Sequence, residues 1–86
     1  MADYKVEIKR SAAKELEKIQ EKDRERIIER IRALAQQPRP PHAIKLSGED
    51  KYRIRQGDYR ILYQIHDDVV TVVVVRIRHR RDVYKR

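Results

Sequence analysis

The spacing of hydrophobic positions changes several times along the chain, and each change marks a predicted element. Residues 4–9 alternate between apolar and charged side chains, which predicts a half-buried strand. Apolar residues then recur at helical spacing in residues 12–19 and again in residues 27–35. Ser11 and Asp23 are residue types that cap helices, so we expect one helix to begin at each. This part of the chain predicts a strand followed by two helices.

A proline-rich segment and three further strand patterns follow. The prolines between residues 38 and 41 end the second helix, because proline lacks an amide donor and restricts the residue before it. The strand patterns occupy residues 51–56, 59–66 and 69–78. Gly57-Asp58 and Asp67-Asp68 are two-residue turn candidates, which predicts an antiparallel meander. The whole order predicts a two-layer α+β fold, in which a helical hairpin covers one face of a four-stranded sheet.

Length and cysteine content narrow the class of protein. The 86 residues suffice for one domain over residues 1–86. The chain has no cysteine, which excludes disulfides and thiolate zinc sites. It shows no apolar signal core and no run long enough to cross a membrane, so we expect a cytoplasmic protein without a membrane partner.

The charge of the chain is positive and unevenly distributed. The net charge is +8 and the pI is about 10.0. Residues 1–50 carry 12 Lys/Arg against 10 Asp/Glu, whereas residues 51–86 carry 10 against 4. Eight of these last ten basic residues are arginine, whose guanidinium makes forked contacts with phosphate. The excess favours nucleic acid as the partner, and a merely solvated basic surface is the alternative.

The predicted turns also determine which side chains share a face. The first turn places Arg55 opposite Arg60, with Arg53 on the same face, and the second places Arg60 opposite Val75, which brings His79 to that face. Like charges that face each other across strands are destabilising unless an anion lies between them. We therefore predict a phosphate-binding site there, with arginines that splay into solvent or pair with a nearby carboxylate as the alternative. The opposite face, which we expect the helices to cover, carries Tyr52, Ile54, Ile61, Tyr63, Ile65, Val70, Val72 and Val74.

Few side chains are suited to catalysis. His42, His66 and His79 lie on separate segments without metal-ligand spacing, so no metal is expected. The two serines and two glycines fit neither a nucleophile elbow nor a phosphate-binding loop, and no cofactor is expected. RNA cleavage by the RNA's own 2′-hydroxyl needs only cations and proton-transfer groups. Arginines can supply the cations, and His79 and Tyr84 are the candidates for proton transfer.

The chain resembles the RelE/ParE toxin superfamily, and its RelE branch most closely. The resemblance spans nearly the whole chain and rests on the order of elements, on KLSG at 45–48, and on YRIRQGDYRILYQI at 52–65 and RIRHRRDVYKR at 76–86. GDYRILY at 57–63 also occurs in branches that are not nucleases. HRRDVY at 79–84 is more specific, because its tyrosine is a RelE-type feature.

The resemblance implies the toxin of a type II toxin–antitoxin system. Such a toxin is an mRNA interferase, a metal-independent endoribonuclease that cleaves mRNA in the ribosomal A site by 2′-hydroxyl attack and inhibits translation. A small acidic RelB-like antitoxin is the implied partner. Matching positions assign catalytic roles to Arg60, His79, Arg80 and Tyr84. We expect RNA contacts from Arg53, Arg55, Lys51, Lys45, Arg78 and Arg81.

Two other functions remain open at this point. One is a ParE-like inhibitor of DNA gyrase, which acts by protein binding. The other is a basic nucleic-acid-binding module without activity. His79 and Tyr84 favour the nuclease over the gyrase inhibitor.

Overall fold

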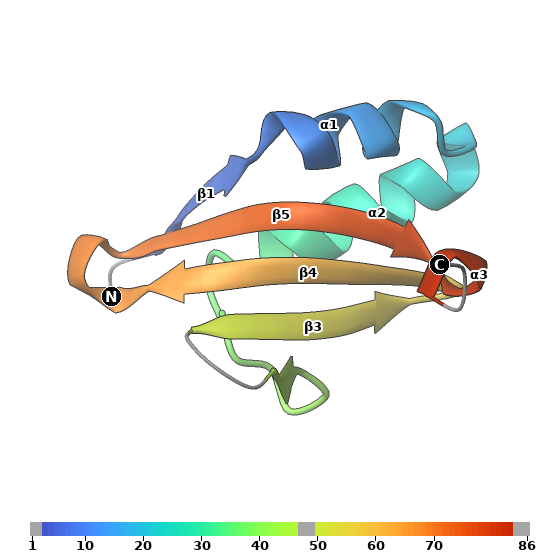
Figure 1. Cartoon of the computed structure of the whole chain (residues 1–86). Coiled ribbons are helices and arrows are strands. Elements are labelled where there is room, and N and C mark those ends of the chain that lie inside the picture. The colour runs from blue at the N-terminus through green and yellow to red at the C-terminus, as the bar shows by residue number, and fades with distance from the viewer. Residues whose placement is uncertain (1–2, 47–49, 84–86) are drawn as a thin grey trace.

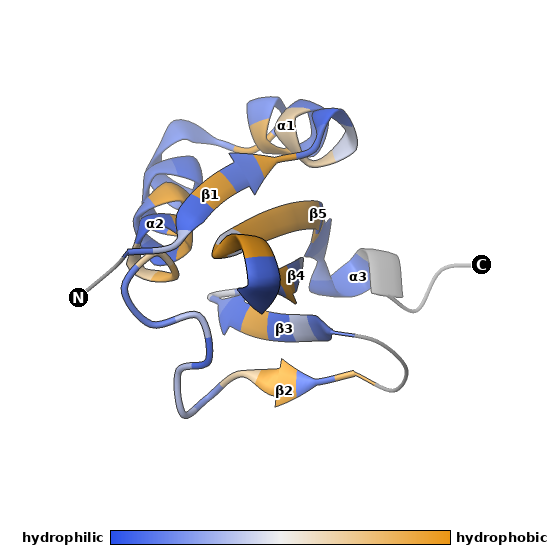
Figure 2. Cartoon of the chain, turned by 90° about the vertical axis from the view of Figure 1, so that its left-hand side faces the viewer, coloured by the Kyte–Doolittle hydropathy of each residue, from blue (hydrophilic) through white to orange (hydrophobic). Residues whose placement is uncertain are grey.

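The computed structural model describes residues 3–46 and 50–83. Within these residues the chain forms strand β1 (Lys5–Ile8), helices α1 (Arg10–Glu17) and α2 (Glu21–Ala33), and strand β2 (Ile44–Lys45). Strands β3 (Lys51–Gln56), β4 (Tyr59–His66) and β5 (Thr71–His79) follow, and helix α3 (Arg80–Val83) comes after them. Figure 2 shows α2 and α3 on opposite sides of the sheet.

The described residues form one five-stranded sheet in the order β1-β5-β4-β3-β2 (Figure 1). β1 runs parallel to β5, and the other neighbours are antiparallel, so β3, β4 and β5 form the predicted meander. The predicted α+β fold is confirmed. The predicted number of four strands is wrong, because β2 pairs with the outer edge of β3. A strand of two residues is too short to show alternation in the sequence.

Both main helices begin before the predicted caps. α1 begins at Arg10 and α2 at Glu21, and neither has a side-chain cap. Asp23 lies in the first turn of α2, where its negative charge interacts favourably with the helix dipole. Ser11 donates its Oγ hydrogen bond to the carbonyl oxygen of Val75 in β5, at 3.0 Å. None of the helices in the described ranges is long and apolar enough to cross a membrane.

The core lies between the helices and one face of the sheet. Figure 2 shows the apolar residues concentrated in β4 and β5. The residues that we expected under the helices are buried, with the exception of Val70, which is 36% exposed at the end of the turn before β5. Ile77 joins the core in addition and is 3% exposed. Its burial shows that the alternation of β5 changes phase along the strand.

The turn between β4 and β5 is longer than the two residues predicted. Asp67–Val69 form a 3₁₀ turn, and Val70 has a φ of 48°. The first pair beyond the turn is therefore His66 with Thr71. Compared with the prediction, the register moves by two residues, which leaves each side chain on its predicted face because a strand has a period of two.

A β-bulge within β5 then shifts the register by one further residue. Tyr63 pairs with Val74, whereas Leu62 pairs with Arg76, so Val75 is an extra residue on β5. A shift of one residue turns every following side chain to the opposite face. The bulge explains why residues after it lie on faces that the sequence did not predict.

Helix α1 holds the bulged segment in place. β1 pairs with only the first half of β5, and α1 lies beside the remaining edge. Ser11 satisfies the carbonyl group of Val75, and Glu15 Oε1 accepts a hydrogen bond from the backbone amide of Ile77 at 2.8 Å. Glu15 Oε2 also accepts from Arg76 Nε at 3.1 Å. Side chains of α1 thus accept or donate the hydrogen bonds of β5 backbone groups at the edge where no neighbouring strand is available.

A hydrogen-bonded network stabilises the opposite end of the sheet. Arg39, in the proline-rich loop, donates from Nη2 to Asp67 Oδ2 at 2.8 Å and from Nε to the hydroxyl of Tyr52 at 2.9 Å. Tyr4 donates its hydroxyl hydrogen bond to Asp67 Oδ1 at 2.6 Å. The hydrogen bonds from Arg39 and Tyr4 lower the pKa of Asp67. One carboxylate thereby joins the residue before β1, the loop after α2 and the β4–β5 turn.

We predict that Asp67→Asn lowers stability at neutral pH and that this effect depends on pH. Because the folded-state pKa of Asp67 is lowered, its contribution is present above the ordinary carboxyl pKa of about 3.9 and is lost as the pH falls through the lower folded-state value. The urea midpoint of the wild type should exceed that of the variant at pH 7, and the two should converge in acid. Asp68→Asn, which changes the neighbouring exposed carboxylate, is the matched control. A deficit of Asp67→Asn that is constant with pH would contradict the assignment.

Candidate functional site

Three arginines lie side by side across three adjacent strands. Arg55 of β3 pairs with Arg60 of β4, and Arg60 pairs with Arg78 of β5. Paired side chains share a face, with Cβ atoms roughly 4.5–5.5 Å apart. This face is the one that α1 and α2 leave uncovered, since Ile54, Ile61 and Ile77 alternate with the arginines and are buried. The predicted pairing of Arg55 with Arg60 is confirmed, and we name Arg55, Arg60 and Arg78 the arginine row.

The basic surface continues along β3. Lys51 and Arg53 precede Arg55 at alternate positions and therefore lie on the same face. Arg53 pairs with Leu62 and is half-buried, and its Nε is buried without a hydrogen-bond partner among the described residues. A buried donor without an acceptor carries a desolvation cost. The strand thus presents a line of cations that ends at the arginine row.

Three arginines of this face, Arg53, Arg55 and Arg60, have no ion pair within the described part of the chain, residues 3–46 and 50–83. Asp58, two residues before Arg60, instead places its Oδ1 3.8 Å from Arg80 Nη1. Like charges across a strand pair repel each other, and a bound anion relieves the repulsion. The arrangement is suited to bind a phosphate group.

His79 does not join the arginine row, and its predicted place on the face of Arg60 is wrong. It pairs with Tyr59, and the two rings meet edge-on, with centroids 5.1 Å apart and planes at 85°. Tyr59 packs against the core, so His79 lies on the face covered by the helices. The bulge is the cause, because it brings Arg78 to the position opposite Arg60. His79 Nδ1 accepts a hydrogen bond from the amide of Arg81 at 3.1 Å, which requires that nitrogen to carry no proton.

The C-terminal helix begins beside the turn between β3 and β4. Gly57 in this turn has a φ of 60°, a conformation that glycine adopts readily. The amide of Arg80 donates to the carbonyl oxygen of Asp58 at 2.7 Å, and this contact fixes the start of α3 next to the arginine row. Tyr84, the predicted proton-transfer residue, lies outside the described residues.

The other predicted RNA-binding residues are dispersed. Lys45 pairs with Tyr52, so its side chain lies on the helix-covered face and away from the arginine row. Arg81 is exposed in α3.

Sequence reasoning did not single out Glu15, which holds the segment leading to Arg78, because an acidic residue on a helix is usually a solvated one. In the described ranges, no three His, Asp or Glu side chains gather to hold a metal ion.

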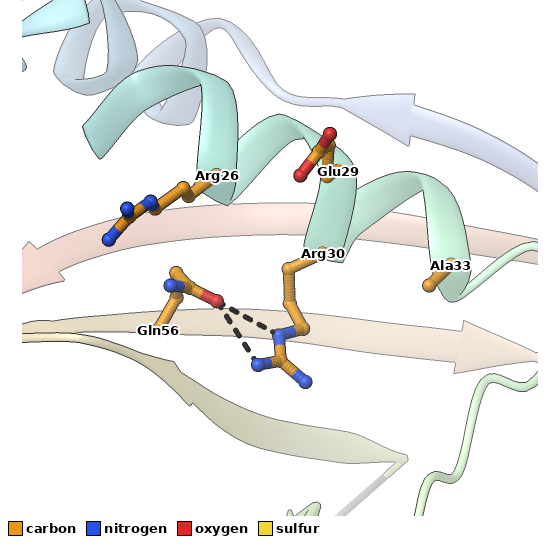
Figure 3. Close-up of a pocket in the computed structure, with 5 residues that line it drawn as sticks. All are labelled: Arg26, Glu29, Arg30, Ala33 and Gln56. Atoms are coloured by element: carbon orange, nitrogen blue, oxygen red, sulfur yellow. Dashed lines mark hydrogen bonds between the residues drawn. The ribbon is translucent and has the colours of Figure 1, made fainter. Parts of the chain in front are cut away.

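A cavity of about 320 Å³ lies between α2 and the end of β3 (Figure 3). Arg30 crosses it and donates from Nε and Nη2 to Oε1 of Gln56, at 3.2 and 3.1 Å. Its Nη1 lies 3.0 Å from Nε2 of His42. These contacts engage the guanidinium of Arg30 and join α2 to β3 and to the proline-rich loop. We interpret this cavity as part of the structural framework.

Known proteins with similar sequences and structures are toxins. Residues 6–84 match the family described as the ParE toxin of the type II toxin–antitoxin system parDE. A RelE-like toxin protein of Escherichia coli is 33% identical over 86 residues, which covers 94% of this chain and 90% of that protein. Toxin RelG of Mycobacterium tuberculosis is 49% identical over 35 residues, or 41% of this chain and 40% of that protein. A chain in the solved RelBE toxin–antitoxin complex of M. tuberculosis superposes with a TM-score of 0.80 at 29% identity, covering 90% of this chain and 98% of that chain.

We predict that sulfate stabilises the folded protein by binding at the arginine row. At ten times its Kd, such an anion contributes about 1.4 kcal/mol, or roughly 5–10 °C in Tm for a domain of this size. Sulfate also stabilises proteins in general, so the informative quantity is the difference between variants at equal ionic strength. Arg60→Gln should lose most of the gain, whereas Arg26→Gln, at an exposed arginine of α2, should keep it. Equal gains in wild type and Arg60→Gln would rule out the site.

Proposed function

Because the chain belongs to the ParE toxin family of type II toxin–antitoxin systems, within the RelE/ParE superfamily, we propose that it is a RelE-like endoribonuclease that cleaves mRNA on the ribosome without a metal ion. The arginine row carries this proposal, since it gathers three guanidinium groups on the face that α1 and α2 leave uncovered. Attack of a 2′-hydroxyl on the adjacent phosphate passes through a phosphorane with additional negative charge. Guanidinium groups held in place by a sheet can stabilise that charge.

Each member of the site has a proposed role. Arg60 is central in the row, and we assign it to the phosphorane, with Arg55 and Arg78 at the flanking oxygens. Arg53 and Lys51 continue along β3, where they are suited to bind the next phosphates of the RNA backbone. Contacts between arginine and phosphate do not depend on the base sequence, so these contacts position the RNA without reading it.

Proton transfer requires a different group. The position of His79 behind the sheet argues against the direct role that the resemblance assigned to it. Tyr84 then takes this role in our proposal. Arg80, anchored to Asp58 at the start of the tail, is assigned to hold the tail near the row.

The proposed substrate and partner follow from the family and the charge. The toxin of a toxin–antitoxin system is neutralised by its antitoxin, and the relative of TM-score 0.80 was solved in complex with its antitoxin. We propose an acidic, amphipathic antitoxin segment that covers the arginine row or displaces the tail, since complementary charge speeds association with a chain of net charge +8. Translating ribosomes are the proposed site of action, and we therefore propose that the activity is cytoplasmic.

Inhibition of DNA gyrase is the second candidate. It is favoured by the description of the matching family, which names ParE toxins. A gyrase inhibitor acts by protein binding and has no need of a phosphorane-stabilising site. The two candidates therefore differ in how they respond to substitutions in the arginine row.

We predict that the wild type cleaves mRNA on programmed ribosomes and that Arg60→Ala and Arg78→Ala each slow single-turnover cleavage by roughly 10²-fold or more. Arg26→Ala on α2 is the matched control and should cleave at the wild-type rate. His79→Gln should slow cleavage far less than Arg60→Ala does, by about tenfold at most, because its ring lies on the other face and does not reach the phosphate at the arginine row. Gyrase-linked DNA breaks without mRNA cleavage would replace this function by the second candidate.

A further prediction separates proton transfer from base stacking at Tyr84. Tyr84→Phe removes a hydroxyl group and keeps an aromatic ring, which can still stack on a base. We expect slow cleavage with nearly normal ribosome binding, measured by single-turnover cleavage and by cosedimentation with ribosomes. Full activity of Tyr84→Phe together with an inactive Tyr84→Ala would make this tyrosine a stacking platform.

A further inference from the structure

A second hollow lies behind the arginine row, on the helix-covered face. This cavity of about 380 Å³ opens where β4 begins and β5 ends, and it reaches the C-terminal side of α1. Tyr59 and Arg60 are consecutive, as are Arg78 and His79, so the cavity and the row use neighbouring positions of the same two strands. The residues lining the cavity are Glu15, Lys18, Ile19, Tyr59, Ile77 and His79.

The chemistry of this cavity is aromatic and apolar, with a cation at the rim. Ile19 and Ile77 are buried, and the rings of Tyr59 and His79 stand at 85° to each other. Lys18 is exposed at the end of α1. The carboxylate of Glu15 is engaged by the backbone of β5 and by Arg76, which offsets its charge. A flat, partly polar ring with a phosphate attached suits these walls.

We propose that this cavity binds an unpaired nucleobase of RNA, which stacks on the ring of Tyr59 beside the perpendicular ring of His79 while Lys18 contacts the phosphate of the same nucleotide. Small-ligand clefts measure about 300–1,000 Å³, and base stacking on aromatic rings is the usual means of holding single-stranded RNA. The net charge of +8 favours RNA over an apolar protein segment as the occupant.

The proposal rests on the proposed function and adds a base-reading site to it. Phosphate contacts at the arginine row carry no sequence information, whereas a cavity for one base can discriminate among bases. An RNA strand that passes the Gly57-Asp58 turn can present a phosphate to the row and a nearby base to the cavity. The cavity would then set which nucleotide is preferred close to the cleaved bond.

The experiment uses an RNA that cannot be cleaved. A set of 2′-O-methyl uridylate hexamers, each with a single 2-aminopurine at a different position, is titrated against the full chain without ribosomes. Stacking quenches 2-aminopurine, so we expect strong quenching at one position only. Tyr59→Leu should remove this quenching and weaken binding by about tenfold. Tyr4→Leu removes a tyrosine at the opposite end of the sheet and should leave both unchanged.

A second pair of variants tests the cation without disturbing the core. Lys18→Ala should reduce the dependence of log Kd on log salt concentration by about 0.7, the contribution of one phosphate contact in a single strand. Lys5→Ala, at a lysine of β1 whose side chain is 74% exposed, should leave the slope unchanged. Both variants change exposed residues, so they stay informative even where Tyr59→Leu fails to fold.

The outcomes separate the cavity from the nuclease activity. Quenching that is equal at all positions, or that persists in Tyr59→Leu, would overturn the proposal, as would an unchanged salt slope in Lys18→Ala. Unchanged RNA binding combined with a weakened antitoxin complex in these variants would make the cavity a protein-binding surface. If the chain cleaves mRNA but shows no position-specific quenching, only the base-binding proposal is overturned. If it shows the quenching but does not cleave mRNA, only the proposed nuclease function is overturned.

Discussion

The position of the candidate site depends on one extra residue in β5. Before Val75, the buried apolar positions of this strand are Val72 and Val74, and after it the buried apolar position is Ile77. An uninterrupted strand would instead bring Arg78 to the helix-covered face, where a guanidinium without a carboxylate partner is costly. α1 stabilises the interruption through Ser11 and Glu15, which satisfy the backbone groups that a neighbouring strand would otherwise engage. A helix at the edge of the sheet therefore determines the chemistry of its open face.

The fold could be predicted wherever the sequence has a clear period or a residue of unusual backbone freedom. β3 and β4 alternate strongly, and Gly57 supplies the positive φ that a two-residue hairpin requires. The turn after β4 was misjudged because Val70 adopts a positive φ that β-branched residues rarely do, and the sequence offers no glycine there. β2 was not predicted, because a strand of two residues is too short to show an alternation of apolar and polar positions.

The same reasoning explains which part of the site was predictable. A tight hairpin fixes the register rigidly, and so Arg55 was correctly placed opposite Arg60. The register of β5 could not be derived, because residues 72–75 are four consecutive valines that fit either face equally well. Such a run does not indicate which of its residues face the core, and no residue type in it marks the position of a bulge. Arg78 and His79 lie on opposite faces in any register, but the structure was needed to show that Arg78 and not His79 shares the face of Arg60.

The parallel pairing of β1 with β5 has a consequence for the order in which the protein can assemble. These two strands are distant in the sequence, and β1 has β5 as its only neighbour in the described sheet. During synthesis, β1 and α1 leave the ribosome long before the strand that they align, and contacts between distant segments form late in folding. The row of three arginines cannot exist until β5 has been translated and docked. A nascent chain consequently carries these cations dispersed, and the arginine row forms only after β5 has paired with β4.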